Sequence, residues 1–141
     1  MSGDTPANGG LTDWPVALRG VTESIVATRG PNDRWNMAAL GLHTPGEPDE
    51  PVEPTTWGNT RTKRNFHRQG SGVIQFPADP RAFVDAAVTI REEDHPVLPT
   101  ADAWVTVDVE AVATGTEGET EWERWVLRPT DSGTIAERRP R

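Results

Sequence analysis

The sequence predicts a mainly β domain, a small antiparallel barrel that carries short helices. Its clearest β pattern is residues 103–112, where Val105, Val107 and Val109 alternate with polar or aromatic residues. Other short apolar runs are separated by turns rich in glycine and proline. Two segments with helical spacing interrupt the strands, which favours a barrel over a sandwich.

A β-hairpin is expected near the N-terminus. Residues Val21–Thr28 are rich in β-branched side chains, and the run Gly30-Pro31-Asn32-Asp33 is dense in turn formers. A returning strand follows over Trp35–Leu42. Alternation places Trp35, Met37 and Ala39 on one face of this strand, and Asn36, Ala38 and Leu40 on the other.

Residues 43–54 differ from their surroundings in composition. They hold four prolines and four acidic residues, so they cannot bury enough apolar surface to fold alone. We therefore expect an exposed, acidic, proline-rich insertion there, followed by a short strand over Thr55–Trp57.

Two short helices are expected after that strand. Asn59 or Thr60 can cap a helix over residues 61–68, which Gly70 ends and in which Phe66 is the only apolar anchor. Asp79-Pro80 opens a second helix. Its apolar side chains at helical spacing are Phe83, Val84, Ala87 and Val88.

Three further strands are expected, over residues 72–76, 103–112 and 120–128, with a turn at Gly115–Gly118 joining the last two. Strand 103–112 is expected to have one apolar face toward the core and one face exposed to solvent. In the last strand, Trp122 and Trp125 point to opposite faces. That strand is therefore expected to be covered twice, by the barrel core and by a second subunit or another segment.

Composition limits the class of protein. A chain of 141 residues is about one domain, and the absence of cysteine excludes disulfides and thiolate chemistry. Met1–Gly10 has no basic start and no apolar run, and no stretch approaches the length of a membrane span. We expect a cytoplasmic protein without a membrane segment.

The charge balance indicates salt adaptation. There are 22 acidic residues against 14 basic ones, and Lys63 is the only lysine. At molar salt a net charge of −8 costs little stability and keeps the surface hydrated. The alternative is an ordinary acidic protein that is poor in lysine. In either case nucleic acid is an unfavourable partner for a net-negative chain.

Four runs, taken in order, resemble a known family: Val21–Thr28, Trp35–Gly41, Thr60–Phe66 and Asp79–Ala87. The family is the archaeal domain-of-unknown-function family 447, within the FMN-binding split-barrel, flavin-reductase-like superfamily. The resemblance covers about residues 14–130. It implies an antiparallel split β-barrel that holds FMN without a covalent bond, near a homodimer interface.

The resemblance also implies which residues bind the cofactor. Matched residue by residue, they are Asn36, Ala38, Ala39, Thr60, Arg61, Thr62 and Asn65. Physical chemistry supports a phosphate at Thr60–Thr62, because a helix N-terminus offers free N–H groups and Arg61 can form a bidentate pair. Small residues such as Ala38 and Ala39 let the backbone approach a flat ring, and Trp57 can stack on one.

Each of these assignments has a plainer alternative. The basic residues among Arg61–Arg68 can pair with surface carboxylates, and the small residues can serve tight barrel packing. Trp57 can simply fill the end of the barrel. His43, His67 and His95 show no metal-ligand spacing, so we assign no metal.

The expected organisation is a disordered tail over residues 1–13, a split-barrel domain over 14–130 and a C-terminal tail over 131–141. The resemblance implies that related chains continue into a further helical region, and the sequence leaves open whether this chain is a truncated family member. Two functions stay open. One is an FMN flavoprotein, an oxidoreductase of unknown substrate, and the other is a non-catalytic module that binds a nucleotide or RNA through its Arg61–Arg68 surface.

The charge pattern predicts that salt stabilises the fold. At about 0.01 M salt the Debye length is about 30 Å, so excess negative charges repel one another across the whole domain. We expect the melting temperature to rise steadily with salt concentration in a thermal-unfolding series. A melting temperature that stays constant or falls would contradict salt adaptation.

Overall fold

A computed structural model describes residues 13–78, 81, 84 and 91–134 of the chain. These residues form one seven-stranded sheet with the strand order β3-β7-β6-β4-β1-β2-β5. Every strand pairing is antiparallel, which confirms the predicted fold class. The elements are β1 (Val21–Arg29), β2 (Trp35–His43), β3 (Thr55–Trp57), α1 (Arg61–Gln69), β4 (Ser71–Pro77), β5 (Arg91–Glu93), β6 (Ala101–Glu117) and β7 (Thr120–Thr134).

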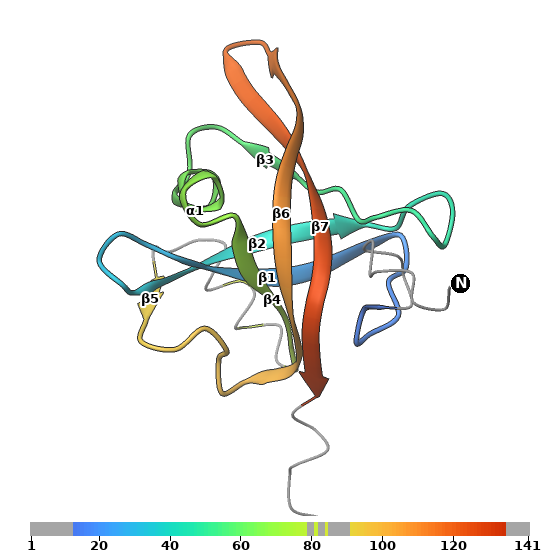
Figure 1. Cartoon of the computed structure of the whole chain (residues 1–141), viewed down its shortest axis with the longest axis vertical. Helices are drawn as coiled ribbons and strands as arrows, with labels where there is room; N and C mark the ends of the chain where they lie inside the picture. Colours follow the sequence, from blue (N-terminus) through green and yellow to red (C-terminus); the bar gives the residue numbers. More distant parts are fainter. Residues whose placement is uncertain (1–12, 79–80, 82–83, 85–90, 135–141) are drawn as a thin grey trace, which may run out of the picture.

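The strands cross in two groups (Figure 1). Strands β1 and β2 run across the long β6–β7 hairpin, and α1 lies at one side of this crossing. The predicted first hairpin is present, with pairs from Val21↔His43 to Arg29↔Trp35. Its turn contains Asp33 at φ 64°, a left-handed conformation that aspartate tolerates better than most residues.

Buried apolar side chains lie on both faces of β1 and β4. The larger cluster includes Val26, Leu42, Phe66, Ile74, Val105, Trp125 and Leu127. The smaller cluster consists of Ile25, Ala27, Met37, Val73 and Leu98, with Trp104 packed against it. Gln75 fastens the segment over this second cluster, since its Nε2 donates to the carbonyl of Pro96 at 2.8 Å and its Oε1 accepts from the Leu98 N–H at 2.7 Å. The prediction of a wholly wet face on strand 103–112 was therefore wrong at Trp104.

The β6–β7 hairpin is longer than expected and projects from the body of the molecule (Figure 1). We call its outer part, residues 110–124, the arm. The predicted turn at 115–118 was wrong only in its start, because Gly115 lies within β6, where a Cβ would stand 2.6 Å from the Trp122 ring. The chain turns at Gly118, whose φ is 62°.

The proline-rich segment over residues 43–54 is exposed only in part. Residues 46–50 are exposed, but Val52 is fully buried and bridges to Leu127 of β7. The Leu127 N–H donates to the Val52 carbonyl at 3.0 Å, and the Trp125 N–H donates to the Pro54 carbonyl at 2.9 Å. The expectation of an exposed insertion was wrong at Val52 and Pro54, because backbone pairing along β7 draws them into the sheet.

Of the predicted second helix, from Asp79 to Val88, only Arg81 and Val84 are described, and both are helical; the rest of the prediction lies outside the described residues. In the part of the chain that is described, no helix has the length and apolar character needed to cross a membrane.

The two tryptophans of β7 differ in burial. Trp125 is 2% exposed and packs edge-on against Phe66 at 5.0 Å, and its Nε1 donates to Thr56 Oγ1 at 3.0 Å. Trp122 is partly buried, over Gly115. Trp125 is therefore covered by its own chain, and no second subunit is needed to bury it.

This difference predicts unequal effects of matched substitutions on stability. Trp125→Phe removes a buried donor and leaves a small cavity, so it should lower the free energy of unfolding by about 1–3 kcal/mol. Trp122→Phe should cost less than about 1 kcal/mol. Urea unfolding at high salt measures both, and equal losses would contradict the burial described above.

Candidate functional site

Two pockets border the first turn of α1 and strand β2. The hairpin pocket has a volume of about 280 Å³ and is lined by Gly30, Pro31, Asn32, Asn36, Arg61, Arg64, Asn65, Arg68 and Glu92. The strand pocket has a volume of about 380 Å³ and is lined by Ala38, Ala39, Leu40, Gly41, His43, Thr55, Thr56, Trp57, Thr60 and Thr62.

Helix α1 begins and ends with strong caps. Thr60 is extended (φ −92°, ψ 165°), and its hydroxyl accepts from the Lys63 N–H at 3.2 Å. Gly70 takes a left-handed conformation at φ 69°, and its N–H donates to the Phe66 carbonyl at 2.8 Å. No acidic residue lies in the first turn. The positive end of the helix dipole is therefore not neutralised by a carboxylate of that turn.

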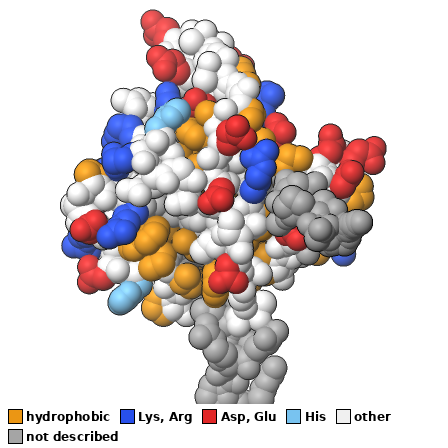
Figure 2. Space-filling model, in the orientation of Figure 1, with side chains coloured by type: hydrophobic (Ala, Val, Ile, Leu, Met, Phe, Trp, Pro, Cys, Tyr) orange, Lys and Arg blue, Asp and Glu red, His pale blue; other side chains and the backbone are white. Residues whose placement is uncertain are grey.

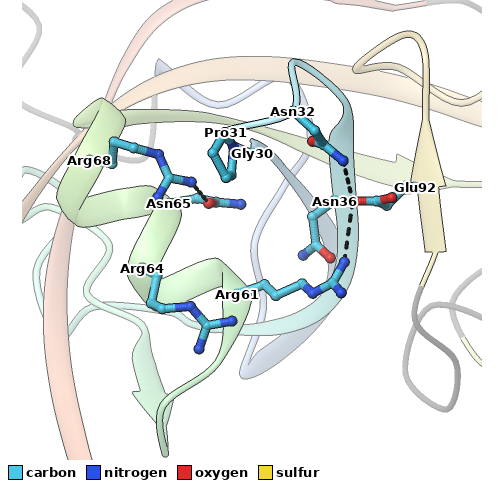
Figure 3. Close-up of a pocket in the computed structure, with 9 residues that line it drawn as sticks. All are labelled: Gly30, Pro31, Asn32, Asn36, Arg61, Arg64, Asn65, Arg68 and Glu92. Atoms are coloured by element: carbon cyan, nitrogen blue, oxygen red, sulfur yellow. Dashed lines mark hydrogen bonds and ion pairs between the residues drawn. The ribbon is translucent and has the colours of Figure 1, made fainter.

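Buried side chains fix the position of α1 on the sheet. Phe66 packs against Trp125, and Asn65 Nδ2 donates to Thr28 Oγ1 of β1 at 3.0 Å. The side-chain oxygen of Asn65, Oδ1, accepts from Arg68 Nη2 (Figure 3). Asn65 is thus used to hold both the helix and an arginine in place.

Arg61 is held across the mouth of the hairpin pocket. Its Nη1 lies 3.2 Å from Glu92 Oε2, and Asn32 Nδ2 donates to the same oxygen at 3.2 Å (Figure 3). Glu92 belongs to β5, which pairs with β2. The Arg61 side chain is 45% exposed and uses only Nη1 on Glu92, so its other N–H groups can contact an anion while the ion pair is kept.

The strand pocket has a floor of small residues and a threonine-rich wall. Ala38, Ala39 and Gly41 leave the backbone of β2 open to close approach. Trp57 lines the pocket and is 51% exposed. The interpretation that Trp57 fills the end of the barrel is therefore wrong, whereas its position suits stacking on a flat ring.

The residues predicted as cofactor-binding all line one pocket or the other. Asn36, Arg61 and Asn65 line the hairpin pocket, and Ala38, Ala39, Trp57, Thr60 and Thr62 line the strand pocket. Their role in binding stays a prediction. Sequence reasoning missed Glu92, because it reaches Arg61 from 31 positions away along the chain and no local pattern marks it.

His67 and Glu123 form a pair that the sequence did not indicate. The two side chains meet at 2.6 Å, and Glu123 is 4% exposed. The His67 ring also packs edge-on against Trp125 at 4.8 Å. This contact joins the far part of α1 to β7. Within the described ranges no three His, Asp or Glu side chains cluster in a way that would hold a metal ion.

The fold defines the class of protein. Nitrilotriacetate monooxygenase component B from Bacillus cereus matches with a TM-score of 0.63 and 13% identity, over 95% of this chain and 79% of that one. Flavoredoxin from Methanosarcina acetivorans matches with a TM-score of 0.56 and 11% identity, over 85% of this chain and 72% of that one. The chain therefore has the flavin-reductase-like split-barrel fold.

The particular family follows from the sequence. The chain belongs to the family described as "Protein of unknown function (DUF447) N-terminal domain", whose model matches residues 22–136. This confirms the resemblance to family 447. An FMN-bound protein from Methanosarcina mazei, assigned to DUF447, matches with a TM-score of 0.64 and 19% identity. The match covers 88% of this chain and 65% of that protein's chain. No curated protein sequence matches the chain.

Proposed function

We propose that this chain binds FMN as a flavoprotein of the flavin-reductase-like type. One observation carries the proposal: the acid-free N-terminus of α1 opens beside the small-residue floor formed by β2. A flavin mononucleotide combines a dianionic phosphate with a flat, largely apolar ring system. The two features of the site match these two parts.

The helix end supplies the phosphate contacts. Free N–H groups of the first turn, the hydroxyl of Thr62 and the guanidinium of Arg61 are donors suited to a phosphate. Thr60 caps the helix and keeps these N–H groups oriented. Thr62 is 6% exposed and lines the strand pocket, so it is screened from bulk water.

The strand pocket supplies the ring contacts. Its volume of about 380 Å³ lies within the range of about 300–1,000 Å³ typical of small-molecule sites. Ala38 and Ala39 admit a ring against β2, and Trp57 can cover it. FMN supplies hydride or electron transfer when bound, whereas the chain binds the cofactor, orients it and limits its contact with water.

FMN-bound and flavin-reductase relatives support the same proposal. They include the DUF447 protein from Methanosarcina mazei and a flavin reductase HpaC complexed with NADP+. The substrate of the present chain stays open. The alternative function is that of a non-catalytic module, which binds a nucleotide or RNA through Arg61–Arg68 and binds no flavin. A net charge of −8 disfavours RNA.

We also infer a salt-adapted cytoplasmic homodimer. Exposed apolar side chains near the strand pocket and on the arm support a subunit interface, namely Trp57 at 51% exposure and Val112 at 47%. The cysteine-free, acidic composition supports the compartment and the salt adaptation. Light scattering at high salt should give a dimer mass, and a monomer mass across the concentration series would contradict the interface.

The proposed function predicts that Arg61→Gln weakens FMN binding by about tenfold or more. The reason is the loss of a charge-assisted contact worth about 1.5–3 kcal/mol. The measurement is a fluorescence titration of FMN into flavin-free protein at fixed salt.

Arg128→Gln is the matched control. Arg128 is also a half-exposed arginine in a single ion pair, with Glu110 at 2.9 Å, but it lines neither pocket. The control should bind FMN like the parent chain. Equal affinities for the parent and both variants would refute the assignment of Arg61, and no FMN binding by the parent would refute the proposed function.

A further inference from the structure

The hairpin pocket carries more positive charge than a single phosphate needs. We propose that it is a second anion site, which takes the phosphate or carboxylate group of a small anionic substrate beside the flavin. This inference rests on the proposed function, because it names the class of substrate that the flavin site serves.

Arg64 and Arg68 have no carboxylate partner among the described residues. Their neighbours on α1 do, since Arg61 pairs with Glu92, Lys63 with Glu121 and His67 with Glu123. Figure 2 shows Lys and Arg side chains over the α1 side of the molecule and acidic side chains at the tip of the arm. In a chain with 22 acidic residues, two arginines that line one pocket and bind no carboxylate of the described residues favour an anionic ligand.

The amide of Asn36 adds a polar group to the same pocket. Asn36 is 6% exposed as a whole residue, and its amide, which makes no hydrogen bond with another described side chain, is open to the hairpin pocket. It lines the hairpin pocket, and Figure 3 shows its amide between Asn65 and Arg61. An amide NH2 group can donate to a phosphate or carboxylate oxygen, so Asn36 can help to hold an anion bound in this pocket.

The two arginines are already oriented. Arg64 Nη1 donates to the Asn59 carbonyl at 2.8 Å. Arg68 donates to Asn65, which is itself bonded to Thr28 in the core. Each of these bonds uses one donor of a guanidinium that has five, so both arginines keep N–H groups for an anion. Glu92 is the one carboxylate in the lining, and Arg61 and Asn32 already bind it.

The flavin phosphate cannot occupy the whole basic face of α1. Arg64 and Arg68 follow Arg61 by three and seven residues, which corresponds to about 4.5 Å and about 10 Å along the helix axis. A phosphate at the first turn is therefore separate from the Arg68 guanidinium. The pocket's volume of about 280 Å³ suits a small molecule rather than a second nucleotide.

Pyrophosphate and malonate are suitable probes, one for phosphate and one for carboxylate substrates. The experiment is isothermal titration of each probe into the FMN-loaded protein at fixed salt. The expected result is saturable binding of at least one probe, with the preferred probe indicating the source of the anion. The double variant R64Q/R68Q should weaken that binding at least tenfold, and Asn36→Ala should weaken it severalfold.

Two controls make the outcome specific. Arg128→Gln should leave probe binding unchanged, and R64Q/R68Q should keep the FMN affinity of the parent within about twofold. Both arginines are exposed, so circular dichroism should show an unchanged fold.

Two results would overturn the second site. One is probe binding that is absent or indifferent to R64Q/R68Q. The other is a probe that displaces FMN, combined with a loss of FMN affinity in R64Q/R68Q as large as the loss in Arg61→Gln. That result would make this pocket the flavin-phosphate site. Arginine-dependent probe binding by a chain that never binds FMN would instead refute the proposed function and leave an anion site.

Discussion

Helix α1 is held on the sheet by two buried contacts, and both pockets depend on them. Phe66 packs against Trp125 of β7, and Asn65 donates to Thr28 of β1. Together they fix the rotation of the helix as well as its position. The N-terminus of α1 consequently faces β2, and the side chains of Arg64 and Arg68 line the hairpin pocket.

The charges of the molecule are arranged around the same helix. The chain is strongly acidic, and three of its carboxylates bind the other basic side chains of α1, which are Arg61, Lys63 and His67. The positive end of the helix borders the pockets, together with Arg64 and Arg68, which bind no carboxylate among the described residues. Local positive charge inside a net-negative domain attracts small anions, while the rest of the surface repels a long polyanion. This distribution favours a small cofactor or substrate over nucleic acid.

Local signals predicted the elements that build the site, and long-range contacts escaped prediction. The turn residues Gly30–Asp33 fixed the first hairpin, and the caps Thr60 and Gly70 fixed α1 almost to the residue. Val52 was missed because its burial comes from pairing with Leu127, and Glu92 was missed because β5 brings it to Arg61 from a distant part of the chain. Gly115 looked like a turn residue, although it serves to admit the Trp122 ring. The amino-acid composition and the hydrophobic periodicity of a segment carry no information on contacts with residues far away in the sequence.

The most direct test of the account is a crystal structure of the chain grown with FMN. The account predicts electron density for one flavin, with its phosphate at the first turn of α1 beside Arg61 and its ring against Ala38 and Ala39. It also predicts that the hairpin pocket stays open beside the phosphate. A flavin phosphate bound between Arg64 and Arg68, or a flavin that contacts neither α1 nor β2, would contradict it.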